Sequence, residues 1–323
     1  MYLGVDGGGT KTAFVLVDAA GNILATHQEG GSYYIQTGMD AVRRALASGV
    51  RATLAKAELS TADIQFAFFG LPAHGEDGAQ TEILDQLPSD LFQRPVYLCG
   101  NDMVCGWAGS LACGDGISVV AGTGSISYGE YAGRSARCGG WGELFSDEGS
   151  AYWIARAGLK LFSRMSDGRE PKGPLYDIFR ERMNLREDID LTSTIYSQWR
   201  GERDLIAGLS KLVHEAAVAA DVQARAVFER AGHELAAMVH ATRQSLQIPA
   251  GVGVPVSYSG GVFNTGAIVL EPFAAALNAA AADYTLQTPR FSPAIGAALY
   301  AARASGSPLN AEALRRLQAQ AGR

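Results

Sequence analysis

The sequence predicts an α/β protein of two domains, because it contains two β-hairpins of the same design about one small domain apart. The first joins an apolar strand at residues 2–5 to a β-branched and aromatic strand at 13–17. The second joins an apolar strand at 117–121 to an alternating strand at 126–131. A glycine-rich turn connects the strands of each pair. Since 323 residues are enough for two domains with separate cores, this repetition predicts an internal duplication.

The first domain, at residues 1–115, is expected to alternate strands and helices after its hairpin. The apolar patterns predict a strand at 23–26, an amphipathic helix at 39–59, strands at 64–71 and 95–99, and a helix at 103–112. This series indicates one α/β domain.

The second domain, at residues 116–323, begins with the second hairpin and is richer in helix. Residues 205–246 are rich in Ala, Leu, Glu and Arg, which predicts one or two long helices. A strand at 254–259, helices at 266–282 and 294–304, and a terminal helix from Asn310 follow. The terminal helix could pack back on the first domain. The charged segment 171–190 is expected to be a surface excursion.

Charge and composition argue against several classes of partner. The net charge is −6 and no basic cluster stands out, so nucleic acid is not expected to bind. We expect no membrane span, because no run of about 18 apolar residues occurs, and no signal peptide, because the chain starts directly with a strand. Cys99, Cys105, Cys113 and Cys138 lack C-x-x-C spacing. The lack of this spacing argues against a structural zinc site and favours free thiols in a reducing cytoplasm.

The turn of the first hairpin is a candidate phosphate loop. Gly8 and Gly9 let the backbone turn tightly and point bare amides at an anion, with Thr10 and Lys11 beside them. Gly4, Gly9 and Lys11 nearly satisfy the Walker pattern, but Thr10 stands where that pattern requires Lys, and a strand follows instead of a helix. The sequence therefore predicts a phosphate loop of another kind.

The turn of the second hairpin repeats the first, with Thr123 and Gly124 in the run G-T-G-S. Taken alone, either turn could be an ordinary hairpin connection, because glycine is common in turns. Two such turns with Thr or Ser beside the glycines favour a duplicated device that grips one polyphosphate.

Asp102 is the candidate catalytic residue. It follows the strand at 95–99 and starts a helix, at the position where open α/β sheets place their ligand crevices. A carboxylate there could be a helix N-cap, which would make it structural. It could also be a general base that takes a proton from an attacking hydroxyl, as its place between two phosphate hairpins favours.

Two further glycine-rich stretches are candidate ligand contacts. In the block at 138–150, Gly140 and Gly142 free the backbone, Trp141 offers a flat apolar face, and Asp147 could accept hydrogen bonds from sugar hydroxyls. Alternatively, Ser146 or Asp147 caps the helix that follows. The turn at 259–264 is either a bare connection or a backbone approach to the sugar or base of a nucleotide.

In this order, D-G-G-G-T-K, N-D, A-G-T-G-S, G-G-W-G-x-x-x-x-D-E-G-S-A-Y-W and S-G-G-V-F resemble the BadF/BcrA ATPase family. Within it, the chain most resembles the N-acetylglucosamine kinases, members of the superfamily of sugar kinases, heat-shock ATPases and actin. The resemblance spans nearly the whole chain. It implies two ribonuclease-H-like (actin-like ATPase) domains that close over ATP and an amino sugar, with Mg²⁺.

The resemblance also implies a role for each matching residue. Asp102 corresponds to the sugar-binding catalytic base, and Asp6 to the acid that orients magnesium, usually through water. The remaining residues fall into three sets: the phosphate loops, with Gly8, Gly9, Thr10, Lys11, Thr123 and Gly124; the sugar contacts, with Tyr33, Ser125, Gly140, Trp141, Gly142 and Asp147; and the adenosine side, with Gly260, Gly261 and Asn264.

The leading hypothesis is therefore an ATP-dependent kinase that phosphorylates the 6-hydroxyl of N-acetylglucosamine, a cytoplasmic enzyme expected to be a homodimer. Glucosamine and N-acetylmuramic acid are alternative sugars. A second class is an ATPase that activates an iron–sulfur redox enzyme, for which Cys113 and Cys138 could be misread as cluster ligands. A third is a sugar-sensing repressor, which would need an additional DNA-binding segment and basic charge.

Tyr33 departs from the pattern of the family, which commonly has Asn there to contact the sugar. Asn both donates and accepts hydrogen bonds, whereas Tyr33 offers one hydroxyl and a ring. Tyr33 could stack on the sugar, point away while Tyr34 or Gln36 serves, or simply cover apolar surface.

We predict that wild type uses N-acetylglucosamine better than glucosamine. Comparing kcat/KM for both sugars in wild type and Tyr33→Asn tests this, and turnover of neither sugar by either protein would contradict it.

Overall fold

The computed structural model describes residues 1–92, 94–280 and 283–321, and the chain divides into two compact units. Unit 1 contains Met1–Asp115 and Thr288–Arg323, and unit 2 contains Gly116–Gln287. The chain divides after residue 115, where the second hairpin begins. The expectation that the second domain runs to residue 323 is wrong, because the segment from Thr288 onward returns to the first unit.

Unit 1 is built on a five-stranded sheet, sheet A, in the order β3-β2-β1-β4-β5. Strand β1 is antiparallel to β2, β2 is antiparallel to β3, and β1, β4 and β5 run parallel. The apolar runs form these strands as predicted, with bounds Tyr2–Gly7 for β1, Lys11–Val17 for β2, Ile23–Gly30 for β3, Phe66–Leu71 for β4 and Tyr97–Asn101 for β5.

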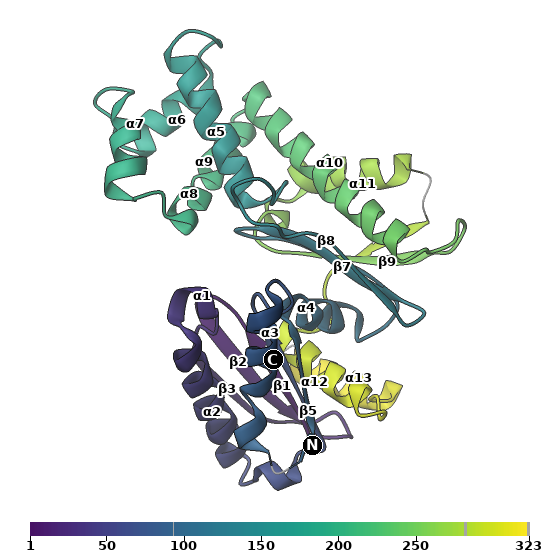
Figure 1. Cartoon of the computed structure of the whole chain (residues 1–323). Helices are drawn as coiled ribbons and strands as arrows, with labels where there is room; N and C mark the ends of the chain where they lie inside the picture. The colour runs from purple at the N-terminus through teal and green to yellow at the C-terminus, as the bar shows by residue number, and fades with distance from the viewer. Residues whose placement is uncertain (93, 281–282, 322–323) are drawn as a thin grey trace. The chain divides into compact units, whose positions relative to one another are not determined.

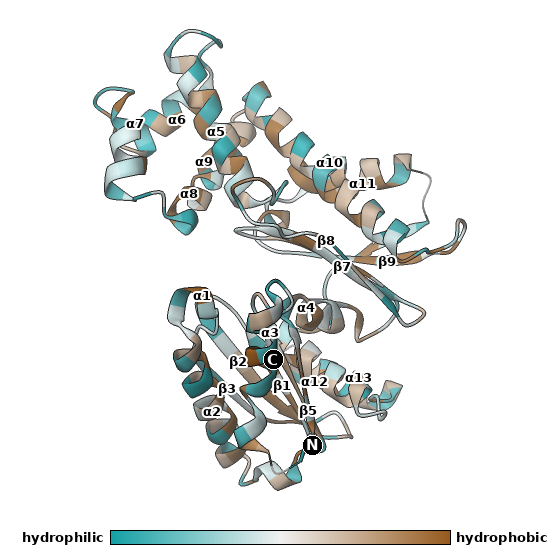
Figure 2. Ribbon diagram, viewed as in Figure 1, coloured by the Kyte–Doolittle hydropathy of each residue, from teal (hydrophilic) through white to brown (hydrophobic). Residues whose placement is uncertain are grey.

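Helices pack on both faces of sheet A (Figure 1). One face forms a core with α2, in which Leu3, Val5 and Leu46 are buried. The other face packs against α12 and α13, with Val15, Ile295 and Leu317 among the buried residues. Figure 2 shows hydrophobic residues along the strands of sheet A and a mixture of hydrophilic and hydrophobic residues on α2. The helices of unit 1 are α1 Tyr34–Thr37, α2 Met39–Lys56, α3 Gly78–Gln86, α4 Asp102–Leu111, α12 Pro293–Ala304 and α13 Ala311–Ala321, with short 3₁₀ helices at Thr61–Asp63 and Ser89–Leu91.

Unit 2 repeats the topology of unit 1, which confirms the predicted duplication. Its sheet B has the order β10-β9-β6-β7-β8. Numbered within unit 2 and read from β8, this is the order third, second, first, fourth and fifth strand, as in sheet A. The strands are β6 Gly116–Ala121, β7 Ser125–Tyr131, β8 Arg134–Gly139, β9 Val254–Ser259 and β10 Tyr284–Gln287. The predictions omitted β8 and β10. The polar sequence R-S-A-R-C-G of β8 gives no apolar pattern, and β10 has only four residues.

The helices of unit 2 lie between β8 and β9 and after β9 (Figure 1). The predicted surface excursion at 171–190 is partly wrong, because it contains helix α6, which buries Leu175, Tyr176 and Phe179 in the core of the unit. Residues 281–282, which were expected to end the helix after β9, lie outside the described residues. The bounds are α5 Ala151–Ser166, α6 Pro174–Arg182, α7 Asp190–Ser193, a π-helix at Thr194–Gln198, α8 Arg203–Gly208, α9 Ser210–Val218, α10 Val222–Ser245, a 3₁₀ helix at Phe263–Thr265 and α11 Ala267–Ala279.

No helix in the described part of the chain is long and apolar enough to cross a membrane.

Gly4 lies where α12 meets β1. A Cβ at Gly4 would lie 2.3 Å from the backbone nitrogen of Ala298 and 2.6 Å from the carbonyl oxygen of Ala294. Gly4 therefore permits contact between the strand and the helix backbone, which explains its presence in the near-Walker pattern without a role in phosphate binding.

We predict that Gly4→Ala destabilises the protein by at least about 2 kcal/mol, because the methyl group overlaps backbone atoms that cannot rotate away. Urea unfolding followed by circular dichroism measures this change. Gly30→Ala is the matched control, since nothing lies within 4 Å of a Cβ at that exposed strand position. Equal stabilities of the two variants would contradict the packing role of Gly4.

Candidate active site

Two carboxylates lie at the carboxyl edge of sheet A. Asp6 is near the end of β1, and Asp102 follows β5, with β4 between the two strands. The parallel register aligns Asp6 with Gly70 of β4, and Gly70 with Gly100 of β5. Asn101, not Asp102, is the N-cap of α4, because its side-chain oxygen accepts a hydrogen bond from the Met103 N–H at 3.1 Å. The alternative that Asp102 is the capping residue is therefore wrong.

Gly70 allows these carboxylates to approach one another. A Cβ at Gly70 would lie 2.1 Å from Cys105 Sγ and 3.3 Å from the Cα of Asp102, so any side chain there would push the start of α4 away from the sheet. The sequence analysis did not find this role. A glycine inside an apolar strand was the available signal, since it often marks a close approach of the backbone.

Burial and the neighbouring carboxylate change the acidity of Asp6. Burial, and after it the negative charge of Asp102, raise the pKa of Asp6 to about 7, although Lys11 acts in the opposite direction. Two carboxylates that repel each other at the edge of a sheet offer oxygen ligands to a divalent cation. In the described residues, no group of three or more His, Cys, Asp or Glu side chains could by itself hold a metal ion.

The first glycine loop lies at the tip of the β1–β2 hairpin, beside the loop that carries Tyr33. Gly9, Thr10 and Lys11 are exposed and Gly8 is half-buried. The N–H of Ser32 donates to the carbonyl of Gly8 at 2.9 Å. This hydrogen bond holds the loop at 31–33 against the first glycine loop.

The hydroxyl of Ser32 is fully buried against Gly7 and has no hydrogen-bond partner among the described residues. Tyr33 precedes the short helix α1, and its ring lies edge-on to that of Tyr34 with 6.5 Å between the ring centres. The oxygen Oε1 of Gln36 would lie 3.5 Å from a Cβ at Gly9. Gln36, one of the alternatives to Tyr33, thus lies beside the loop.

The second glycine loop, at residues 122–124 between β6 and β7, is held by the N-terminus of α5. The N–H of Ala151 donates to the Gly122 carbonyl at 2.9 Å, and that of Tyr152 donates to the Thr123 carbonyl at 3.3 Å. Ser150 caps α5, because its hydroxyl oxygen accepts a hydrogen bond from the Trp153 N–H. The alternative that Ser146 or Asp147 caps this helix is therefore wrong.

Asp147 is the buried partner of an ion pair with Arg203. Its side chain is 3% exposed, and Oδ2 lies 2.7 Å from Nη2 of Arg203, a residue that the sequence analysis missed. Burial raises the pKa of Asp147, while Arg203 and the backbone N–H groups of Gly142 and Ser125 lower it. The backbone of Asp147 is in the left-handed region, with φ of 58°.

The other residues of the block surround this ion pair. Ser125 is buried, and its hydroxyl donates to the Glu148 carbonyl at 2.7 Å. Gly140 and Gly142 have φ values of 69° and 99°, which explains the need for glycine. Trp141 is 69% exposed, with the guanidinium of Arg137 5.6 Å from its ring centre.

A cavity of about 420 Å³ opens beside the second glycine loop within unit 2. Thr123 and Gly261 both line it, whereas Gly260 and Asn264 are not among its lining residues. A Cβ at Gly260 would lie 2.3 Å from the carbonyl oxygen of Ala121, so Gly260 serves packing against β6. Helices α8 and α9 contribute polar side chains that the sequence analysis missed because they belong to no motif: Asp204, Ser210, Lys211 and His214.

A sequence model of the BadF/BadG/BcrA/BcrD ATPase family matches residues 3–301. The chain belongs to this family. Over 313 residues this BadF/BadG/BcrA/BcrD protein is 28% identical to the N-acetyl-D-glucosamine kinase of Dictyostelium discoideum, covering 93% of this chain and 97% of that protein. It is also 28% identical to the N-acetylmuramic acid/N-acetylglucosamine kinase of Clostridium acetobutylicum, covering 85% and 90% of the two chains.

Solved structures share the fold of this family member. A candidate N-acetylglucosamine kinase from Chromobacterium violaceum superposes with a TM-score of 0.70 at 25% identity, covering 93% of this chain and 98% of that chain. A ROK family glucokinase from Streptomyces griseus, in complex with glucose and AMPPNP, has a TM-score of 0.54 at 16% identity, covering 92% and 96%. The predicted fold class, with two actin-like ATPase domains, is confirmed.

The raised pKa of Asp6 predicts how the stability of this BadF/BadG/BcrA/BcrD protein depends on pH. An aspartate in an unfolded chain ionises near pH 4, whereas Asp6 in the folded protein ionises near pH 7. Folding therefore takes up a proton between these values. The contribution of Asp6 to the free energy of unfolding falls across this window as pH rises, by on the order of 2–4 kcal/mol.

Asp6→Asn removes this ionisation, so its stability relative to wild type should increase as pH rises from about 4 to about 7 and then stay constant. Urea unfolding in the presence of a chelator, repeated across this pH range, measures the difference. Asp40→Asn, at an exposed carboxylate in the first turn of α2, is the control. A stability difference between Asp6→Asn and wild type that does not vary with pH would contradict the assignment.

Proposed function

We propose that the protein is an ATP-dependent amino-sugar kinase that phosphorylates the 6-hydroxyl of N-acetylglucosamine. The observation that carries the proposal is the position of Asp102, beside Asp6 and at the edge of the sheet that also presents the first glycine loop. The names of the two curated relatives support the choice of an amino sugar.

In the proposed reaction Asp102 is the general base. Its carboxylate accepts the proton of the 6-hydroxyl while the sugar oxygen forms a bond to the γ-phosphorus of ATP. The bond between that phosphorus and the bridging oxygen breaks, and ADP leaves with the electron pair. The backbone amides of the two glycine loops stabilise the phosphate charge, with Thr10, Lys11, Thr123 and Gly124 beside it.

The cavity of unit 2 is the proposed site of the adenosine. Its volume of about 420 Å³ lies in the range of small-molecule sites. Gly261 lines it together with residues of the helices α8 and α9. Gly260 and Asn264 remain predicted contacts on the adenosine side.

Magnesium is the proposed metal, and the acids of unit 1 fit it. Mg²⁺ is commonly bound by one or two carboxylates together with phosphate oxygens and water. Asp6, whose ionisation is opposed by burial and by Asp102, would be the carboxylate that orients it. When bound, the ion would offset the negative charge of the transferred phosphate.

Several features of the sugar site remain predictions. The proposed sugar contacts are Tyr33, Ser125, Gly140, Trp141, Gly142 and Asp147. N-acetylglucosamine is the first choice and glucosamine the second, while a homodimer and a cytoplasmic location are expected.

For the alternative of an iron–sulfur activator, the two cysteines considered as ligands belong to different units, Cys113 to unit 1 and Cys138 to unit 2.

We predict that Asp102→Asn lowers kcat by about 10²- to 10⁴-fold, the usual effect of losing a general base. ATP affinity should change little, because the amide keeps the size of the side chain. An assay that couples ADP release to a colour change measures turnover, and calorimetry measures nucleotide binding. Asp40→Asn is the control at an exposed site, and near-wild-type turnover of Asp102→Asn would overturn its role as base.

A further inference from the structure

We propose that Arg203 is a positioning residue that links the second glycine loop to the sugar block at 138–150 and thereby couples nucleotide binding to sugar binding. This inference rests on the proposed kinase function. It concerns the residue that begins α8 and that belongs to none of the sequence motifs.

Arg203 binds two carboxylates of the block. Its Nη2 lies 2.7 Å from Oδ2 of Asp147, and its Nε lies 3.2 Å from Oε2 of Glu143. The forked shape of the guanidinium allows it to hold both groups at once, which a lysine cannot do. Arg203 therefore fixes the block at two points.

The same guanidinium lies against the phosphate loop. A Cβ at Gly124 would lie 2.5 Å from Nη2 of Arg203 and 2.6 Å from Oδ2 of Asp147, so the ion pair packs directly on the loop. Any shift of the loop on binding phosphate must move this ion pair. The Arg203 side chain is also 42% exposed, whereas the Asp147 side chain is 3% exposed. Part of Arg203 therefore remains open to solvent.

Arg203 is also connected to the nucleotide cavity. The next residue of α8, Asp204, lines the cavity together with Ala207 and Gly208. The beginning of one short helix therefore contacts the nucleotide cavity, the phosphate loop and the sugar block. Coupling between two sites requires such a shared element whose arrangement both ligands change.

The dependence of Asp147 on Arg203 explains why loss of Arg203 would weaken sugar binding. The carboxylate is buried, its backbone is left-handed, and the cation of Arg203 is the charge that opposes its protonation. Without Arg203, Asp147 would keep only its backbone hydrogen bonds from Gly142 and Ser125. A neutral or displaced Asp147 would be a poorer acceptor for a sugar hydroxyl.

The test measures the affinity for N-acetylglucosamine by calorimetry, with and without a non-hydrolysable ATP analogue. We expect the analogue to tighten sugar binding to wild type by about 5-fold or more. Arg203→Met, which keeps the length of the side chain, should abolish this coupling and raise KM for the sugar by about 10-fold, with a smaller effect on kcat. Arg203→Lys, which keeps the charge but not the fork, should give an intermediate coupling.

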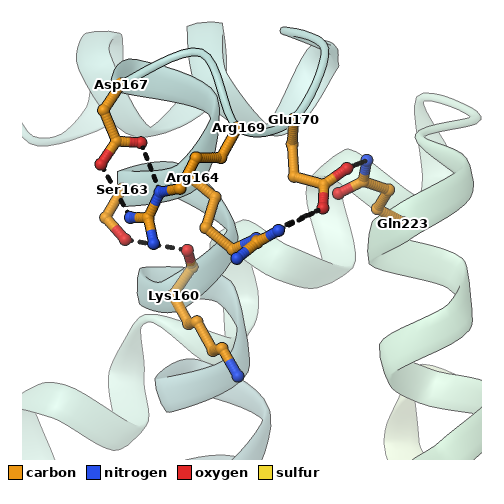
Figure 3. A network of polar contacts seen from close by, with 7 residues as sticks. All are labelled: Lys160, Ser163, Arg164, Asp167, Arg169, Glu170 and Gln223. Atoms are coloured by element: carbon orange, nitrogen blue, oxygen red, sulfur yellow. Dashed lines mark hydrogen bonds and ion pairs between the residues drawn. The ribbon is translucent and has the colours of Figure 1, made fainter.

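The ion pair between Arg164 and Glu170 provides a matched control. Nη2 of Arg164 lies 2.9 Å from Oε1 of Glu170, and the two side chains are 32% and 30% exposed. Figure 3 shows Arg164 in the last turn of α5 and Glu170 beyond it, where Glu170 also contacts Gln223 of α10, in a network that includes Asp167 and Arg169. Arg164→Met removes a comparable ion pair of unit 2 that is not part of the site, so coupling and KM should remain at wild-type values.

The outcomes separate the two proposals. Wild type that neither binds nor phosphorylates an amino sugar would overturn the proposed function. An active wild type without coupling, or coupling retained in Arg203→Met, would overturn the role of Arg203 alone. If Arg203→Met does not fold, Arg203→Lys decides, and wild-type coupling in that variant would overturn the proposal. Equal losses in Arg203→Met and Arg164→Met would indicate general destabilisation and would also overturn it.

Discussion

Direct contact between backbones determines where the candidate base of unit 1 lies. A Cβ at Gly296 of α12 would lie 2.1 Å from the Cys105 carbonyl oxygen, and one at Gly109 of α4 would lie 2.6 Å from the Ser292 carbonyl oxygen. Helices α4 and α12 can therefore pack at backbone distance, and α12 packs in the same way on β1 at Gly4. The start of α4, and with it Asp102, depends on a helix from the far end of the sequence. This dependence explains why the segment from Thr288 onward belongs to unit 1.

Unit 2 positions its candidate residues with a different balance of forces. Gly260 again allows a strand-end turn to contact β6 through the backbone, but an ion pair joins α8 to the block at 138–150 and packs against the second glycine loop at Gly124. Removing Arg203 would leave the charge of Asp147 buried without compensation, which is destabilising. Asp147 and Arg203 therefore depend on each other, whereas the glycine contacts of unit 1 depend only on the absence of a side chain.

The sequence was sufficient where the signal is local. Alternating and apolar runs gave the strands β1, β2, β4, β6 and β9, and the glycine turns between them located both loops. Asp102 was found because a strand followed by a helix is also a local pattern. Arg203, by contrast, meets its partner Asp147 across 56 positions of the chain, and no spacing rule predicts such a contact. Gly4 was noticed for its place in a phosphate motif, yet its role is a contact with α12 that only the folded chain shows.

Several local features at the candidate site are unfavourable for folding, and they occur at the groups that the proposed chemistry needs. Asp6 carries a pKa near 7 because it is buried beside another carboxylate. Asp147 holds a left-handed backbone, and the hydroxyl of Ser32 is buried without a hydrogen-bond partner in the described residues. Each of these features costs about 1–3 kcal/mol in general. At Asp6, the backbone contacts of the same unit at Gly4, Gly70 and Gly296 leave little space for the structure to relax. A divalent cation bound at Asp6 would offset the charge of its carboxylate, which agrees with the role proposed for that residue.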